Sequence, residues 1–128
     1  MKAGGQSPGK PGLGLTPNIS SMLCYICFPV TSLIFLLIEK ENKDVLFHAW
    51  QGTFFGAAVI LLILVLNLLA TILGYLAGFL GALIYSFIIP VVWLGVLVLW
   101  VVCLVKAYQG DRWRIPVIGD MAAQKAGV

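Results

Sequence analysis

Two cysteines separated by two residues, Cys24 and Cys27, form a pattern that carries redox chemistry in many proteins. On a helix both sulfurs would share one face, where they could form a disulfide or bind a metal. The pair lies in an apolar stretch, however, and apolar surroundings raise the pKa of a thiol and make it unreactive. A tetrahedral zinc site needs four ligands, and only Cys103 and His48 remain, at the other end of the predicted helices. We therefore interpret the two cysteines as packing residues and expect no metal site.

His48 is the one histidine of the chain. A histidine can carry a proton or serve as the axial ligand of a haem or another pigment. A single histidine beside interfacial aromatic residues more often makes a polar contact with the protein or with lipid headgroups. We favour this structural role, with Asp111 or Asp120 as its partner, and expect no cofactor. Pigment or haem binding at His48 stays open as an alternative.

The sequence contains no other constellation that could carry a reaction. It has no serine–histidine–acid set, no cluster of metal ligands and no glycine-rich loop followed by a lysine at phosphate-binding spacing. It also has no basic cluster with interleaved aromatic residues of the kind that binds nucleic acid. We therefore expect neither an enzyme nor a nucleic-acid-binding protein.

The elements that must position these residues are membrane helices. Of the 128 residues, 61% are hydrophobic and 10% are charged, whereas about a quarter of the residues in soluble domains are charged. No Lys, Arg, Asp or Glu occurs between Asp44 and Lys106. A helix of about 20 apolar residues matches the thickness of the hydrocarbon core of a bilayer. The composition therefore predicts an all-α integral membrane protein.

The apolar runs predict three transmembrane helices. The first extends over Asn18–Ile38, the second over about Gln51–Leu73 and the third over about Leu80–Val105. Pro29 and Pro90 lie inside the first and third spans. Each proline removes a helical hydrogen bond, so we expect a kink at each position.

Three further segments complete the predicted organisation. Residues 1–17 are rich in glycine and proline and precede the three-span domain, residues 18–106. A polar elbow, Ile38–Gly52, connects the first two spans at the membrane interface. A tail, residues 107–128, follows the last span. Trp113 in this tail has an arginine on each side, which is typical of an anchor at the interface with acidic lipids.

The basic residues predict the orientation in the membrane. With three spans, the elbow and the tail share one side and the N-terminus lies on the other. Basic residues accumulate on the cytoplasmic side. Six belong to the elbow and tail side, and two to the N-terminal side: Lys40, Lys43, Lys106, Arg112, Arg114 and Lys125 against Lys2 and Lys10. We therefore predict a multi-pass protein of the bacterial plasma membrane, with its N-terminus outside and its C-terminus in the cytoplasm.

This orientation brings the elbow and the tail to one membrane face, where we expect them to contact each other. Both segments combine charged residues with aromatic ones, and pairs of opposite charge can form between them. The residues expected at this contact are Glu39, Lys43, His48, Trp50, Asp111, Arg112, Trp113, Arg114 and Asp120.

Small and polar residues within the spans are candidates for helix packing or for a partner interface. Gly52 and Gly56, and likewise Gly74 and Gly78, have the spacing that allows helices to approach closely. Asn67 is the strongest polar residue inside a span, and we expect it to bond to Ser86 or to a partner helix.

The elbow segment LIEKENKDVLFHAWQ and the tail segment KAYQGDRWRIPVIGD also carry a family resemblance. With them, the chain resembles, over about Asn18–Ala122, a family of small bacterial membrane proteins that is similar to the twenty-kilodalton Tic component of chloroplast inner-envelope protein import. The resemblance implies a helical membrane fold. For the plant relatives it implies a role in polypeptide translocation.

Two functions are compatible with this sequence. Three spans enclose little interior, so most of the helix surface must contact lipid, other membrane subunits or a second copy. We therefore expect a non-enzymatic accessory or scaffold subunit of a larger membrane complex. The resemblance keeps open an oligomeric translocation or transport component, in which Asn67, Thr71 and Ser86 would be the candidates to line a polar path.

Overall fold

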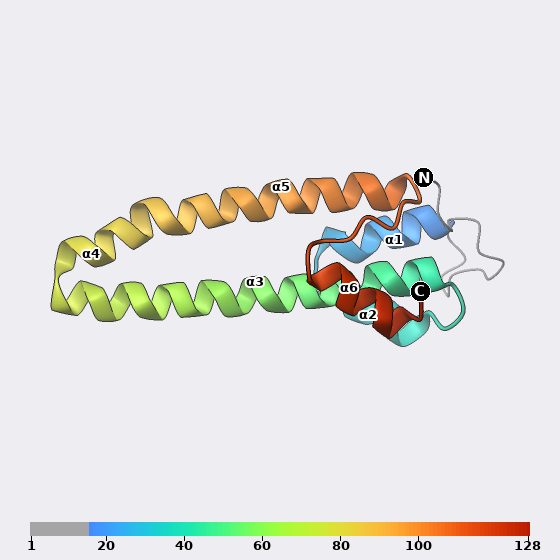
Figure 1. Ribbon diagram of the computed structural model, residues 1–128, viewed down its shortest axis with the longest axis horizontal. Helices are drawn as coiled ribbons and strands as arrows, with labels where there is room; N and C mark the ends of the chain where they lie inside the picture. The colour runs from blue at the N-terminus through green and yellow to red at the C-terminus, as the bar shows by residue number, and fades with distance from the viewer. Residues whose placement is uncertain (1–15) are drawn as a thin grey trace.

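The computed structural model describes residues 16–128, and this part of the chain is helical without strands. Its longest element is α3 (Lys43–Leu76). The chain returns through α4 (Gly78–Leu83), η2 (Ile84–Ile88) and α5 (Ile89–Tyr108), which follow one another without a break. Figure 1 shows these elements as two long antiparallel rods, with the remaining helices gathered at one end.

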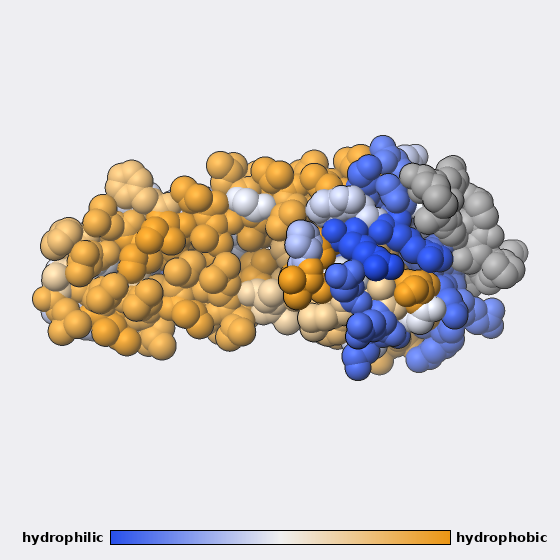
Figure 2. Space-filling model, viewed as in Figure 1, coloured by the Kyte–Doolittle hydropathy of each residue, from blue (hydrophilic) through white to orange (hydrophobic). Residues whose placement is uncertain are grey.

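Both rods have the length and composition of membrane-crossing helices. They comprise 34 and 31 residues, and only 17% and 11% of their most apolar windows are buried within the chain. The core helix of a soluble protein would be mostly buried instead. Figure 2 shows apolar surface over the rods and hydrophilic residues gathered at the end where the other helices lie. The structure thus has the character of an all-α membrane protein.

The turn between the two rods, which we call the far turn, lies between the second and third predicted spans. α3 ends at Leu76 and α4 begins at Gly78, with Ala77 between them. A Cβ atom at Gly81 would lie 2.7 Å from both the Ala70 carbonyl oxygen and the Gly74 Cα atom. Only glycine at position 81 therefore lets the two rods approach so closely beside the turn.

The prediction of a first membrane span over Asn18–Ile38 is wrong. The structure has two short helices in its place, α1 (Pro17–Ile26) and α2 (Val30–Ile38). Pro29 cannot donate a backbone hydrogen bond and precedes α2 as its N-cap, so it ends one helix and starts another instead of kinking a single one. At 1.5 Å per residue each arm is about 15 Å long, half of a hydrocarbon core. Two crossing helices remain, not three.

The α1–α2 hairpin packs against the rods at the end opposite the far turn. A Cβ atom at Gly52 would lie 2.7 Å from Ser32 Oγ, and one at Gly56 would lie 2.7 Å from Pro29 Cβ. The rings of Phe28 and Phe55 stack with their centroids 4.9 Å apart. The Gly52–Gly56 pair, a candidate partner interface in the sequence, thus serves packing within the chain.

The described start of the chain lies at the same end as the elbow and the tail (Figure 1). A Cβ atom at Gly110, just after α5, would lie 3.1 Å from Asn18 Oδ1 in α1. The predicted orientation depended on an odd number of spans; with two candidate membrane helices, the described start and the C-terminus lie at one end of the molecule, and the N-terminal segment before residue 16 lies outside the described residues. We call this end, residues 16–52 and 106–128, the cap.

The irregularity expected at Pro90 takes the form of a π-helical segment. η2 ends at Ile88, two residues before the proline, and the Ile89 N–H bonds to the Ile84 carbonyl oxygen. Pro90 stands in the first turn of α5, where its missing N–H is tolerated. The rod continues through this segment to Tyr108.

Candidate functional site

The most elaborate polar cluster of the described residues lies inside the cap, where α1, α3 and the tail meet. Tyr25, His48 and Gln51 are among its most deeply buried side chains. The Tyr25 hydroxyl lies 2.9 Å from His48 Nδ1 and 2.8 Å from Gln51 Nε2. A side chain from α1 is thereby held between two side chains of α3.

Gln51 extends this cluster to the tail. Its Nε2 group also donates to the Trp113 carbonyl oxygen at 3.1 Å, and its Oε1 atom accepts from the Ile115 N–H at 3.0 Å. These two backbone partners fix the orientation of the amide, since one must accept and the other must donate. In the sequence, Gln51 was recognised only as the start of a predicted span.

The direction of the Tyr25–His48 hydrogen bond follows the tautomer of the imidazole. Gln51 Nε2 donates to the Tyr25 oxygen, so the Tyr25 hydroxyl hydrogen is available to His48 Nδ1 when the ring proton is on Nε2. The backbone of Asp111 lies close to the imidazole. An axial ligand role through Nδ1 would require the ring to give up its bond to Tyr25.

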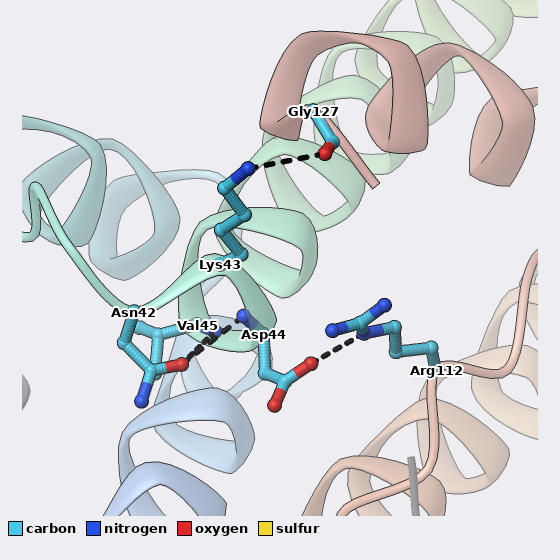
Figure 3. A network of polar contacts seen from close by, with 6 residues as sticks. All are labelled: Asn42, Lys43, Asp44, Val45, Arg112 and Gly127. Carbon is cyan, nitrogen blue, oxygen red and sulfur yellow. Dashed lines mark hydrogen bonds and ion pairs between the residues drawn. The ribbon is translucent and has the colours of Figure 1, made fainter. Parts of the chain in front are cut away.

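A second set of contacts joins the elbow to the tail closer to the end of the cap. Figure 3 shows the carboxylate of Asp44 paired with Arg112, and Lys43 reaching the Gly127 carbonyl oxygen, at 3.4 Å. The Asn42 side chain accepts from the Asp44 and Val45 N–H groups at 3.1 and 3.2 Å and so caps α3. Asp44 is 5% exposed and Arg112 31%, so this ion pair is largely removed from water.

Three further carboxylates of the cap are engaged as well. Glu39 Oε1 accepts from the N–H groups of Glu41 and Asn42, both at 2.9 Å, and this turn ends the elbow ahead of α3. Asp111 pairs with a lysine and Asp120 with an arginine at the surface: Lys106–Asp111 at 3.5 Å and Arg114–Asp120 at 3.1 Å.

The tail returns along α3 as α6 (Ile118–Ala126), and it packs on an aromatic surface of α3. Trp50 stacks with Phe54 at 5.4 Å, and Lys125 Nζ lies 5.9 Å from the Trp50 ring. The Trp113 ring is partly buried against the main core. Its indole therefore packs on protein, whereas the sequence suggested an anchor in lipid.

Gly119 is a site residue that the sequence analysis missed. A Cβ atom there would lie 2.3 Å from Arg114 Cβ and 2.8 Å from Gln51 Oε1. The tail can reach Gln51 only because this position has no side chain. The sequence signal for this turn of the tail was the segment from Ile115 to Gly119, which contains a proline and ends in a glycine.

The cysteines occupy different environments. Cys24 is buried, and its thiol lies 3.3 Å from the Ser20 carbonyl oxygen, to which it donates. Cys103 is buried and Cys27 is exposed, and all three are free thiols. Within residues 16–128 no three His, Cys, Asp or Glu side chains gather closely enough to hold a metal ion.

The polar residues inside the rods bond mainly to their own helix. Asn67 Nδ2 donates to the Ile63 carbonyl oxygen at 2.8 Å, so the expected bond to Ser86 is replaced by a local one. Thr71 donates to the Asn67 carbonyl oxygen and lies 3.3 Å from the Tyr85 hydroxyl. Of the far glycines, Gly74 supports the turn and Gly78 faces open space.

Comparison with known proteins places this architecture among membrane proteins. Residues 16–122 match the family described as the magnetosome magnetite crystal formation protein family. A UPF0132 membrane protein of Methanocaldococcus jannaschii is 38% identical over 118 residues, covering 91% of this chain and 94% of the relative. One from Archaeoglobus fulgidus is 36% identical over 110 residues, covering 86% of this chain and 95% of the relative. No solved structure matches.

Proposed function

The chain belongs to the magnetosome magnetite crystal formation protein family, whose similar archaeal proteins are named as membrane proteins, and on that premise we propose that it is a non-enzymatic scaffold or accessory subunit of a membrane assembly. The observation that carries the proposal is a structural difference between the cap and the rods. The cap is held together by buried polar contacts, whereas the rods expose nearly their whole lateral surface.

The exposed surface of the rods supports this role. Large apolar side chains are exposed along α3 and α5, and several are more than half exposed: Leu61, Leu64, Leu68, Val91, Leu94 and Val98. A soluble protein could not carry such a surface. In a bilayer it is available to lipid and to the helices of other subunits, which need no charge to pack against it.

The polar residues of the cap support a structural role for that end. Four of its five acidic side chains contact backbone N–H groups, a lysine or an arginine within the chain: Glu39, Asp44, Asp111 and Asp120. Asp44 joins the elbow to the tail, and the other three carboxylates stabilise the elbow or the tail itself. The family is named for magnetite crystal formation. We therefore propose that this member contributes to its family's process through the membrane assembly and not by binding mineral with its carboxylates.

We also propose that the cap faces the cytoplasm. Six of the eight basic residues belong to the cap, whereas the far turn, residues 73–80, has none. Positive charge is retained on the cytoplasmic side. The described start of the chain, beside Gly110, then lies in the cytoplasm together with the C-terminus.

A translocation or transport component, as the likeness to the Tic protein implies, is the second candidate. Its support within the rods is a short polar strip, in which Asn67 and Thr71 lie one turn apart and Thr71 meets Tyr85. A translocation path lined by this strip would have to form between several copies of the chain, because the two rods of one chain supply only one such strip. Cross-linking between copies through a cysteine at Thr71 would favour this candidate.

Site-specific photo-cross-linking tests the scaffold role. A photoreactive residue replaces Leu61 or Leu68 on α3, or Leu94 on α5, and membranes are irradiated before solubilisation. We expect a protein adduct of discrete mass from positions on one face and lipid adducts from the others. Gln124, exposed on α6, serves as the control outside the rods. Lipid adducts at every rod position, together with a monomer in mild detergent, would refute the proposal.

A further inference from the structure

α2 has an apolar face that no part of the described chain covers. Its members follow helical spacing: Val30, Leu33, Ile34, Leu37 and Ile38, with exposed fractions of 61%, 47%, 47%, 74% and 36%. The opposite face of α2 is buried, since Ser32 and Phe35 pack inward beside α3. The outward side of the helix is therefore as apolar as its inward side, where Phe35 joins the core, whereas a helix on the surface of a soluble protein turns a polar face outward.

The depth of this hairpin is fixed by its contact with α3. The turn at Pro29 meets Gly56, as the close approach of their atoms shows. From Gly56 to the end of α3 at Leu76 there are about 20 residues, or about 30 Å, which matches a whole hydrocarbon core. With the far turn at one membrane face, the Pro29 turn therefore lies at about the opposite boundary of the hydrocarbon core, and α1 and α2 extend from there into the headgroup layer of the cap-side leaflet.

The surroundings of α2 point to lipid as the occupant of its apolar face. Its own chain carries no charged residue from Thr16 to Ile38, so the face continues the uncharged surface of the rods. On α6, which also packs along the first turns of α3, the exposed residues include Asp120, Gln124 and Lys125. At similar depth the cap therefore presents one apolar flank and one polar flank.

We propose that the α1–α2 hairpin is a wedge that inserts the apolar face of α2 into the lipid of the cap-side leaflet, and that the chain accumulates where this leaflet is convex. Five helices, α1, α2, α3, α5 and α6, lie in the cap-side region, whereas only the two rods cross the far leaflet. Each helix is about 10 Å wide with its side chains. A molecule wider in one leaflet fits best where the lipids of that leaflet are spread apart, which is the convex side of a curved membrane.

Insertion of α2 is tested by fluorescence at single sites. Leu37→Cys and, as a control on the polar flank, Gln124→Cys are labelled with an environment-sensitive dye in a Cys27→Ala background and reconstituted in phosphatidylcholine–phosphatidylglycerol vesicles. We expect the dye at position 37 to be quenched by spin labels on the headgroups and at the top of the acyl chains, and to be shielded from a water-soluble quencher. The dye at position 124 is expected to show the opposite. Equal exposure of both dyes to water would overturn the insertion.

Curvature preference is tested by sorting on membrane tethers. Labelled protein is reconstituted in giant vesicles with the cap outside, and a narrow tether is pulled outward. We expect a several-fold higher ratio of protein to lipid on the tether, an excess that the double variant Leu33→Asn, Leu37→Asn loses. Met121→Asn, which changes an exposed apolar residue of α6, is expected to keep it. Equal densities on tether and vesicle, or an enrichment that survives the double variant, would refute the wedge.

The two measurements also separate the wedge from simple loss of folding. The double variant changes only exposed side chains, so its helicity and its elution volume in detergent should equal those of the parent chain. If it unfolds, the sorting of the parent chain with the cap outside is compared with that of vesicles in which the cap faces the lumen. Enrichment on outward tethers in both orientations would contradict the proposal, because the inward-facing cap then lies on the concave side.

Discussion

The side chain of Gln51 accepts a hydrogen bond from the backbone of Ile115, 64 positions further along the chain, at 3.0 Å. The same amide donates to Tyr25 on α1, so one residue of α3 joins the first helix to the tail. Because these groups are buried, each would cost free energy if it lost its partner. Gln51 is therefore the residue on which the closure of the cap depends most.

Replacing Gln51 by leucine is expected to release the tail. The change leaves two tail backbone groups without partners, and each unsatisfied buried group costs about 1–3 kcal/mol. Opening of the tail should then rise at least about tenfold, since about 1.4 kcal/mol corresponds to a factor of ten. The measurement is the rate of trypsin cleavage after Arg114 in detergent. Gln109→Leu, which changes an exposed amide, should cleave at the parental rate, and equal rates for both variants would contradict this account.

The buried ion pair of Asp44 and Arg112 is expected to be energetically coupled, unlike the exposed pair of Arg114 and Asp120. Exposed fractions of 5% and 31% for the first pair, against 47% and 69% for the second, are the reason. A double-mutant cycle with alanine should give about 1–3 kcal/mol of coupling for the first. The second should give about 0–1 kcal/mol and lose it in high salt. Similar couplings for both pairs would show that burial does not set the difference.

Gly56→Ala is expected to destabilise the protein, whereas Gly95→Ala is not. A new Cβ atom at position 56 would lie 2.7 Å from Pro29, but nothing lies within 4 Å of one at position 95. Overpacking of this kind costs about 1–3 kcal/mol. The unfolding temperatures of the two variants are compared in detergent by following the circular dichroism signal of their helices. A matched loss of stability in both variants would mean that α3 and α1–α2 do not pack as described.

Cysteine labelling is expected to place the described start and the tail on one side of the membrane. In a Cys27→Ala background, Thr16→Cys and Gln109→Cys should react with an impermeant maleimide from the same side, and Tyr75→Cys from the other. Tyr75 is 89% exposed at the far turn and is a suitable reporter. Sealed vesicles of both orientations provide the measurement. Labelling of positions 16 and 109 from opposite sides would restore a third span.

The rods could be predicted from the sequence because lipid imposes a simple requirement. A charge-free run between Asp44 and Lys106, divided by glycines near Tyr75, has to form two helices and a turn. The structure gives α3 and α4–α5 with the turn at Ala77. Each rod is longer than predicted, because its cap end lies in protein contacts that hydropathy does not describe.

The α1–α2 hairpin could not be recognised by hydropathy, because two short apolar helices have the same composition as one long transmembrane helix. The residues that distinguish two short helices from one long helix do so through contacts with α3. Pro29 packs where Gly56 has no side chain, and Ser32 packs where Gly52 has none. Tyr25 and Gln51 were missed for the same reason. Their value comes from partners in other segments, and a single sequence does not show which segments meet.

The turn between α3 and α4 also bears on the biosynthesis of the protein. With the cap in the cytoplasm, as proposed above, residues 73–80 are the loop that has to pass through the bilayer, and it has no Lys, Arg, Asp or Glu. Carrying a single ionised side chain to the centre of a membrane costs about 2.5–3.5 kcal/mol, and this loop avoids that barrier. In that orientation the two rods can insert as one helical pair without moving a charged side chain across the membrane.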